Sequence, residues 1–100
     1  MSQVWKFELR HVSNIVEMPI DSEVLCAKKQ RDVPCIWVRV DPEKEKVKRR
    51  FLIVGTGHEI PESQFAHYVG TFFGDSVGSY VWHVFEDVHY DPELHGEGAS

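Results

Sequence analysis

The sequence predicts a mainly β protein: a small antiparallel sandwich or barrel of about six to seven strands with at most one short helix. Three observations support this prediction. Short apolar runs recur at close spacing, helical periodicity is almost absent, and Gly, Pro, Asp and Asn separate the runs. A chain of 100 residues with 42% hydrophobic residues can form one domain with its own core.

Seven runs are predicted to be strands, and they cover residues 4–9, 14–18, 23–30, 34–40, 47–54, 68–73 and 79–85. The first alternates, so that Trp5, Phe7 and Leu9 share one face, as in a half-buried strand. The second is short and ends at Pro19. The third and fourth flank Arg31-Asp32 and predict a hairpin.

The fifth run is apolar on both faces at residues 51–54, which is expected of a central strand. It ends abruptly at Gly55-Thr56-Gly57-His58. Residues 60–67 have room for one helical turn, with Pro61 at an early position where its missing N–H does no harm. The last two runs are separated by residues 74–78, whose glycines suit a hairpin connection.

The formal net charge of −5 is unevenly distributed. Five acidic residues and no Lys or Arg lie between Glu86 and Ser100, whereas residues 28–50 contain nine basic and four acidic residues. A concentrated positive segment attracts an anionic ligand, and an acidic tail disfavours broad nucleic-acid binding. The alternative is that these charges lie on solvated strand and turn faces. We expect residues 1–87 to form one β-rich domain and residues 88–100 to form a flexible acidic tail.

Several functional classes lack their motifs in this sequence. The two Cys are not in a CxxC and the six His include no HExxH, so no metal or cofactor is expected and the thiols are expected to be free. No nucleophile elbow, Walker or Rossmann motif is present, so we do not expect an enzyme. His83 is interpreted as a hydrogen-bonded core or interface histidine. No apolar run spans a bilayer and no secretory signal is evident, so a soluble protein in a reducing compartment is expected.

Gly55-Thr56-Gly57-His58 is a candidate anion site. Two glycines at a strand end let the backbone approach a ligand, and consecutive N–H groups with the Thr56 hydroxyl can bind phosphate oxygens. His58 adds a donor. A tight turn with one positive φ explains the same residues equally well.

Trp37 and Arg39 share one face of the predicted fourth strand. If residues 41–44 turn the chain into a hairpin, Arg39 lies near Lys48 or Arg49, and an anion would relieve the repulsion. Trp37 then offers an aromatic face for a base. Alternatively, Trp37 belongs to the core and the basic side chains extend into water. The predicted ligand-binding residues are Trp37, Arg39, Arg49, Arg50, Thr56, Gly57, His58 and Trp82.

Several short strings are distinctive when taken together: residues 4–9, 18–19, 34–37, 40–42, 50–51, 55–58 (GTGH), 68–72 (YVGTF) and 81–86 (VWHVFE). With these strings the chain resembles a family of small proteins of unknown function that are encoded by phages and prophages. The resemblance covers about residues 4–86. It implies a phage origin and action in the host bacterial cytoplasm, without assigned catalytic residues.

By analogy with small phage proteins that act by binding, the leading hypothesis is a non-enzymatic homo-oligomer. It would sequester a small anionic nucleotide-type ligand, such as a host immune signal. The first alternative is a protein-interaction module that inhibits a host factor through a strand edge or an aromatic patch. The second is an accessory virion protein. No membrane partner is expected.

Overall fold

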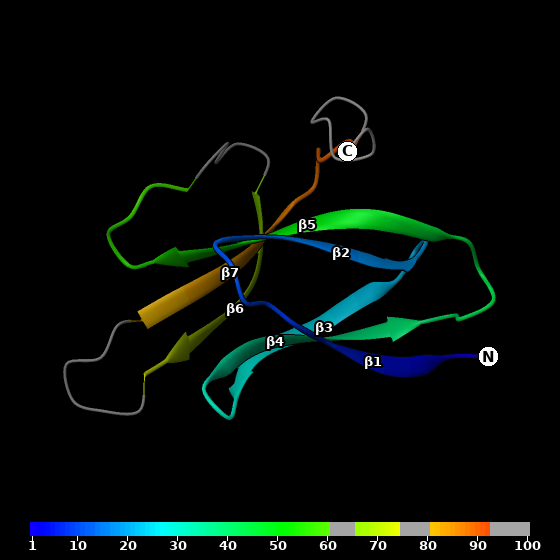
Figure 1. Cartoon of the computed structure of the whole chain (residues 1–100), viewed down its shortest axis with the longest axis horizontal. Coiled ribbons are helices and arrows are strands. Elements are labelled where there is room, and N and C mark those ends of the chain that lie inside the picture. The colour runs from blue at the N-terminus through cyan, green and yellow to red at the C-terminus, as the bar shows by residue number, and fades with distance from the viewer. Residues whose placement is uncertain (61–65, 75–80, 93–100) are drawn as a thin grey trace.

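The computed structural model describes residues 1–60, 66–74 and 81–92, and these residues form seven strands and no helix. The strands are β1 (Gln3–Glu8), β2 (Ser13–Pro19), β3 (Glu23–Gln30), β4 (Val33–Val40), β5 (Lys46–Gly55), β6 (Ala66–Phe73) and β7 (Val81–Asp87). They form a three-stranded sheet of order β1-β4-β3 and a four-stranded sheet of order β2-β5-β7-β6, with every pairing antiparallel (Figure 1). The predicted antiparallel β fold is therefore confirmed. Among the described residues, no helix is long and apolar enough to cross a membrane.

The strand bounds agree closely with the predicted runs, and β5 lies inside its sheet between β2 and β7 as its two apolar faces predict. The predicted helical turn falls at residues 60–67. Ala66 and His67 of this segment belong to β6, and residues 61–65 lie outside the described part of the chain. Of the predicted loop at residues 74–78, only Gly74 is described.

The predicted hairpin at Arg31-Asp32 is present between β3 and β4. Gln30 pairs with Val33, and the two residues between them have φ values of 51° and 65°. Positive φ at both central positions is the signature of a type I′ turn, whose twist matches that of the flanking strands. The turn thus fixes the register of β3 against β4.

Residues 41–44 form a turn, in which the N–H of Lys44 donates to the carbonyl of Asp41, but this turn does not make a hairpin of β4 and β5. β4 pairs with β1 and β3, whereas β5 pairs with β2 and β7. Because β1 and β3 already occupy both edges of β4, the chain after Asp41 cannot pair back onto β4, and it crosses to the other sheet. This crossing separates Arg39 from Lys48 and Arg49.

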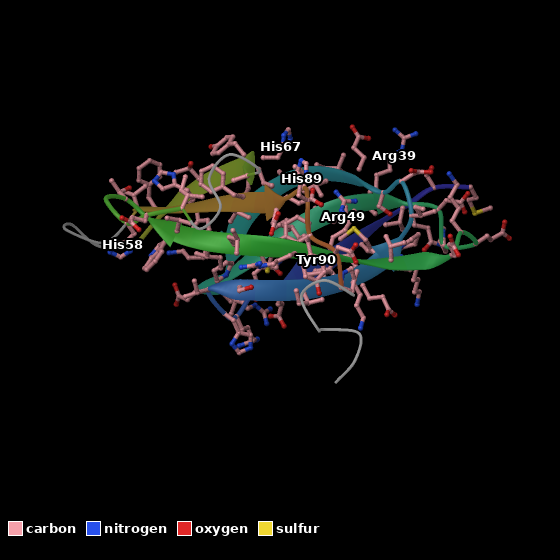
Figure 2. All side chains as sticks on the ribbon, turned by 90° about the horizontal axis from the view of Figure 1, so that it is seen from above. Arg39, Arg49, His58, His67, His89 and Tyr90 are labelled. Atoms are coloured by element: carbon pink, nitrogen blue, oxygen red, sulfur yellow. The ribbon has the colours of Figure 1, made fainter. Side chains whose placement is uncertain are left out.

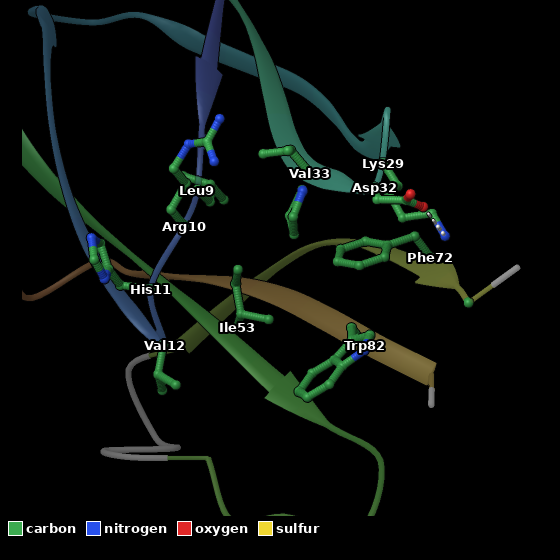
Figure 3. A pocket seen from close by; sticks show the side chains of 12 residues that line it. Leu9, Arg10, His11, Val12, Lys29, Asp32, Val33, Ile53, Phe72 and Trp82 are labelled. Atoms are coloured by element: carbon green, nitrogen blue, oxygen red, sulfur yellow. Dashed lines mark ion pairs between the residues drawn. The ribbon is translucent and has the colours of Figure 1, made fainter. Parts of the chain in front are cut away.

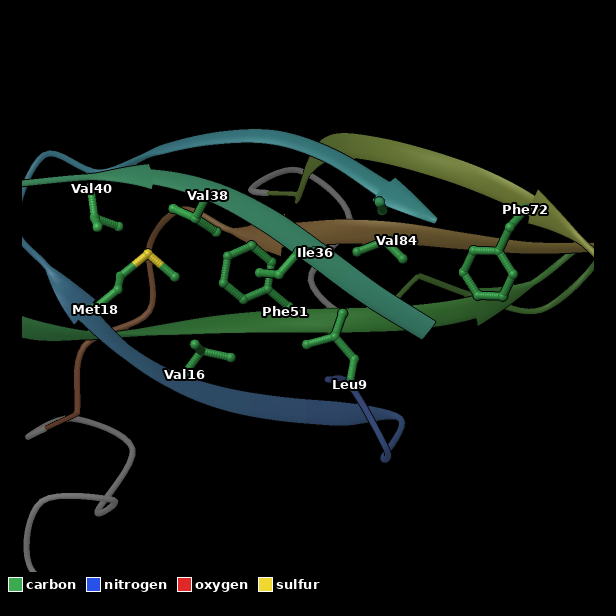
Figure 4. Close-up of a cluster of buried hydrophobic side chains, with 10 residues drawn as sticks. Leu9, Val16, Met18, Ile36, Val38, Val40, Phe51, Phe72 and Val84 are labelled. Carbon is green, nitrogen blue, oxygen red and sulfur yellow. The ribbon is translucent and has the colours of Figure 1, made fainter. Parts of the chain in front are cut away.

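The core lies between the two sheets and is built by strand alternation. Leu9, Ile36, Val38, Phe51 and Val84 are fully buried there (Figure 4). Burying such a side chain contributes roughly 1.5–3 kcal/mol, so these positions supply much of the stability.

The sheets approach closely along one side of the sandwich. At Gly70 of β6, an added Cβ would lie 3.1 Å from both the Cβ and the carbonyl oxygen of Ala27 of β3. Glycine is therefore needed for the edges of β3 and β6 to meet. Along the opposite side, β1 and β2 leave a groove of about 610 Å³ between them.

Candidate functional site

A cavity of about 420 Å³ opens between the sheets at one end of the sandwich (Figure 3). The β1–β2 connection meets the end of β3, the start of β4, the ends of β5 and β6 and the start of β7 there. The residues that line it are Leu9, Arg10, His11, Val12, Lys29, Asp32, Val33, Pro34, Ile53, Phe72, Gly74 and Trp82.

The floor of this pocket is apolar and partly aromatic. Leu9 and Phe72 are buried core residues, and Ile53 and Trp82 pack against the same core. Phe72 and Trp82 are paired across β6 and β7, so their rings belong to one face of the four-stranded sheet. The floor is therefore suited to a flat apolar group.

The rim of the pocket is polar and carries two basic side chains. Arg10 contacts Glu8 at 3.0 Å, with 62% of its side chain exposed, and Lys29 contacts Asp32 at 3.7 Å. The Arg10–Glu8 contact is exposed on both sides, and such a pair is weak in water. A ligand anion can therefore compete for Arg10.

A buried asparagine holds the rim in shape. Asn14 accepts a hydrogen bond from the backbone N–H of His11 at 3.0 Å and donates one to the carbonyl of His11 at 2.6 Å. Such side-chain bonds fix a local turn that has no strand partner. The corner that carries Arg10 and His11 is thus built before any ligand arrives.

Of the eight residues predicted to bind a ligand, Trp82 lines this pocket. Its ring needs the glycine at position 55, where an added Cβ would lie 3.3 Å from the Trp82 ring and 3.0 Å from Nδ1 of His58. His58 therefore folds back over the end of β5 toward Trp82. These two residues are the part of the predicted site that the fold brings together.

Arg49 and Arg50 are engaged within the protein. Arg49 forms a two-bond ion pair with Glu86, and Arg50 contacts Asp87 at 3.4 Å and Ser13 at 3.0 Å. The two carboxylates belong to the acidic end of the sequence, but they lie in β7, which pairs with β5. Carboxylates of β7 thus neutralise both arginines, and neither arginine is presented as a phosphate ligand.

Trp37 and Arg39 lie on the outer face of the three-stranded sheet. Arg39 is paired in register with Glu23 of β3, and their charged groups are 3.8 Å apart. Arg39 and His58 lie toward opposite ends of the molecule (Figure 2). The fold does not bring these residues together, because Arg39 lies in the three-stranded sheet and His58 follows β5 of the four-stranded sheet.

Gly55-Thr56-Gly57-His58 forms a tight turn. The N–H of Thr56 donates to the carbonyl of Val81, the N–H of His58 donates to the carbonyl of Gly55, and Gly57 has a φ of 89°. A positive φ at the third residue is what a type II turn requires. These donors are used in the fold, so of the two interpretations of the sequence the geometry favours the turn.

His83 bridges two threonine hydroxyls on the outer face of the four-stranded sheet. Its Nε2 lies 2.8 Å from Oγ1 of Thr56, and its Nδ1 lies 2.9 Å from Oγ1 of Thr71, which also contacts Tyr68. His83 is hydrogen-bonded as interpreted from the sequence, but it is only partly buried and lies outside the core cluster. No three His, Cys, Asp or Glu side chains of the described segments are grouped to hold a metal ion.

Sequence reasoning missed most residues of the pocket. Leu9 and Phe72 have the pattern of ordinary core positions, and Arg10 and His11 have that of a connection. The available signal was the pair of polar residues directly after an apolar strand, but nothing local indicates that the ends of five strands meet around it.

The fold and the pocket define the class of this protein: a two-sheet antiparallel β-sandwich with an aromatic-floored pocket at one end. The chain belongs to the family described as domain of unknown function (DUF7352), whose model matches residues 1–94. The match extends beyond Glu86, where the motifs noted in the sequence end. No curated protein and no solved structure matches the chain significantly.

Proposed function

We propose that this protein is a non-enzymatic binding protein that takes a small ligand with a flat apolar ring and a negative charge into the pocket at the sandwich end. The observation that carries the proposal is the combination of Phe72 and Trp82 in the floor with Arg10 and Lys29 at the rim. The volume of about 420 Å³ falls in the range of small-molecule sites.

A nucleotide-type ligand fits this chemistry. Its base would stack on the aromatic floor, a contact worth about 1–3 kcal/mol per base in other systems. A phosphate would replace the exposed Glu8 carboxylate beside Arg10, and Lys29 would add positive charge at the rim. The resemblance to small phage proteins supports sequestration of such a ligand, for example an immune signal in the cytoplasm of a bacterial host.

The test is ligand depletion. The protein is incubated with a panel of cyclic dinucleotides and ADP-ribose derivatives, removed by filtration, and heated to release the ligand that it holds. We expect one member to be depleted and recovered unchanged. Depletion of no member, or recovery of a converted product, contradicts the proposal.

Two variants locate the site in the same assay. Arg10→Glu repels an anion at the rim, and Trp82→Leu removes the ring of the floor, so both should weaken depletion about tenfold or more. Arg39→Glu is the matched control, because it makes the same charge change on the outer face of the other sheet. Loss of depletion with Arg39→Glu alone would move the site away from the pocket.

A second candidate function is protein interaction through β6. Tyr68 and Phe73 are 56% and 68% exposed on the outer face of this edge strand. Exposed aromatic side chains are typical anchors of protein interfaces. A Tyr68→Ser/Phe73→Ser variant that keeps ligand depletion but loses a stoichiometric host partner would favour this function.

A further inference from the structure

The two sheets end in four edge strands, and these edges differ in how they are covered. The edges of β3 and β6 meet at Ala27 and Gly70. The edges of β1 and β2 face the groove of about 610 Å³, and in the described part of the chain neither has a second strand partner. An open strand edge is a template for pairing with another chain.

A proline removes one hydrogen-bond donor from the open edge of β2. The N–H of Ile53 donates to the carbonyl of Val12, so the even-numbered residues of β2 bond to β5 and the odd-numbered ones point outward. Pro19 occupies an outward position and has no N–H to offer. The strand is thereby protected against continuous pairing.

The edge of β1 has no such protection. The N–H of Leu9 donates to the carbonyl of Pro34, so odd-numbered residues of β1 bond to β4. The backbone N–H and C=O groups of Val4, Lys6 and Glu8 therefore point toward the groove. β1 contains no proline and no described bulge.

We infer that β1 pairs antiparallel with β1 of a second copy of this chain, with Phe7 at the centre. The charges of Lys6 and Glu8 favour a second copy as the partner of β1, and they favour this register. A two-fold axis perpendicular to the sheet places residues of the same face opposite each other. With Phe7 at the centre, Lys6 lies opposite Glu8 of the second copy, and Glu8 lies opposite its Lys6.

The other registers within the strand lack this complementarity. Centring on Lys6 places two lysines opposite each other, and centring on Glu8 places two glutamates opposite each other; both arrangements are destabilising. Centring on Trp5 places Lys6 opposite the uncharged Val4. Within one chain Lys6 donates to Gln30 and Glu8 contacts Arg10, so both side chains exchange an exposed partner on dimerisation. Only the Phe7 register places Lys6 and Glu8 opposite a residue of the other sign.

The Phe7 register also pairs the open backbone groups of β1 and places apolar side chains opposite each other on the inner face. Lys6 and Glu8 are the residues whose N–H and C=O groups face the open edge, so the oppositely charged pair is also the hydrogen-bonded pair. On the inner face, Trp5 lies opposite Leu9 of the second copy, and both are apolar. The two three-stranded sheets then join into one sheet of six strands.

Dimerisation through β1 also affects the pocket. Arg10 and His11 line both the groove and the pocket. In the Phe7 register, Val4 and Gln3 of the second copy lie opposite these residues, so the second copy stands beside the pocket mouth. The dimer itself does not depend on the proposed ligand.

Sedimentation equilibrium of the full chain tests the dimer by charge exchange. We expect a dimer that Lys6→Glu and Glu8→Lys each weaken about tenfold or more, because each creates a like-charge pair. The Lys6→Glu/Glu8→Lys double variant should recover most of the wild-type dissociation constant. Lys28→Glu and Glu17→Lys are matched controls on other strands and should leave the dissociation constant unchanged.

Amide hydrogen exchange of the wild-type protein gives a second test that no folding defect can disturb. The N–H groups of Lys6 and Glu8 should be protected at high protein concentration and lose protection on dilution, whereas that of Phe7 stays protected in both. A wild-type protein that is monomeric at millimolar concentration overturns the inference, as does a double variant that stays as weak as the single ones. Rapid exchange of Lys6 and Glu8 at every concentration also overturns it.

Discussion

Arg49 of β5 and Glu86 of β7, which are neighbouring strands of the four-stranded sheet, form an ion pair with Nε to Oε2 and Nη2 to Oε1 distances of 2.6 and 2.7 Å. The Arg49 guanidinium also donates to the carbonyl of Ser22 at 2.7 Å and lies over the Phe51 ring. The Arg49 and Glu86 side chains are 21% and 11% exposed. Through these partly buried hydrogen bonds, Arg49 links β5 to β7 and to the β2–β3 connection.

Removing one partner of this pair should be much worse than removing both. Arg49→Met leaves the Glu86 carboxylate buried without a cation and should lower the free energy of unfolding by about 3–5 kcal/mol. The Arg49→Met/Glu86→Leu double variant should be destabilised by less than Arg49→Met alone. Urea unfolding of both variants measures this, with exposed Lys28→Met as the control; a double variant less stable than Arg49→Met would contradict the argument.

Replacing Gly57 should be unfavourable because of its positive φ and not because a side chain would clash with a neighbour. Its φ is 89°, and an added Cβ would meet no atom within 4 Å. Gly57→Ala should therefore cost about 1–2 kcal/mol, and Gly57→Asn should cost less, because Asn tolerates the left-handed region better. Thermal unfolding compares the two, and equal stability of Gly57→Ala and wild type would refute the turn.

Gly70 should resist replacement for the opposite reason. An added Cβ would lie 3.1 Å from the Ala27 carbonyl oxygen and 3.3 Å from its backbone nitrogen, as well as 3.1 Å from its Cβ. Gly70→Ala should cost about 1–3 kcal/mol through overpacking. Ala27→Gly removes the side-chain contact alone, so it should fail to rescue Gly70→Ala; full rescue in urea unfolding would show that the backbones are not in close approach.

Cys35 should make stability fall in alkaline solution. It is 1% exposed, and burial raises the pKa of its thiol above the usual 9.0. The unfolded chain then loses this proton at a lower pH than the folded one, so stability is complete below pH 9.0 and is lost as the pH rises through the raised pKa. Unfolding measured from neutral to alkaline pH should show this loss, and Cys35→Val should remove it.

Thiol labelling provides a check on the same residue. Cys26 is partly exposed, whereas Cys35 is buried beneath a hydrogen bond of 2.6 Å between Lys6 and Gln30 that spans the sheet. Cys26 should react first in the folded protein. Equal rates for both thiols would show that Cys35 is open to solvent.

The fold was largely predictable from local pattern. Alternation places Trp5, Phe7 and Leu9 on one face, and the apolar residues 51–54 mark the central strand β5. These signals depend only on neighbours in the chain. Which sheet a strand joins depends on free edges elsewhere, and for this reason the turn after Asp41 does not pair β4 with β5.

The site was less predictable, because the charge of a sequence segment does not show which charged side chains are neutralised by distant residues in the fold. Arg49 and Glu86 are 37 positions apart, yet β5 and β7 are neighbours and the two side chains neutralise each other. Trp82 was identifiable because an aromatic residue in an apolar strand run is visible locally. Its companions in the pocket come from the β1–β2 connection and from the ends of other strands, and no local pattern brings them together.

Binding in the pocket at the sandwich end is the central claim, and nuclear magnetic resonance of the labelled protein tests it most directly. The ligand retained from the panel of cyclic dinucleotides and ADP-ribose derivatives is titrated into the protein. We expect the largest shifts at the indole N–H of Trp82 and at the amides of Arg10, His11 and Ile53. Shifts confined to Trp37 and Arg39 on the outer face, or no shifts with any member of the panel, would contradict the account.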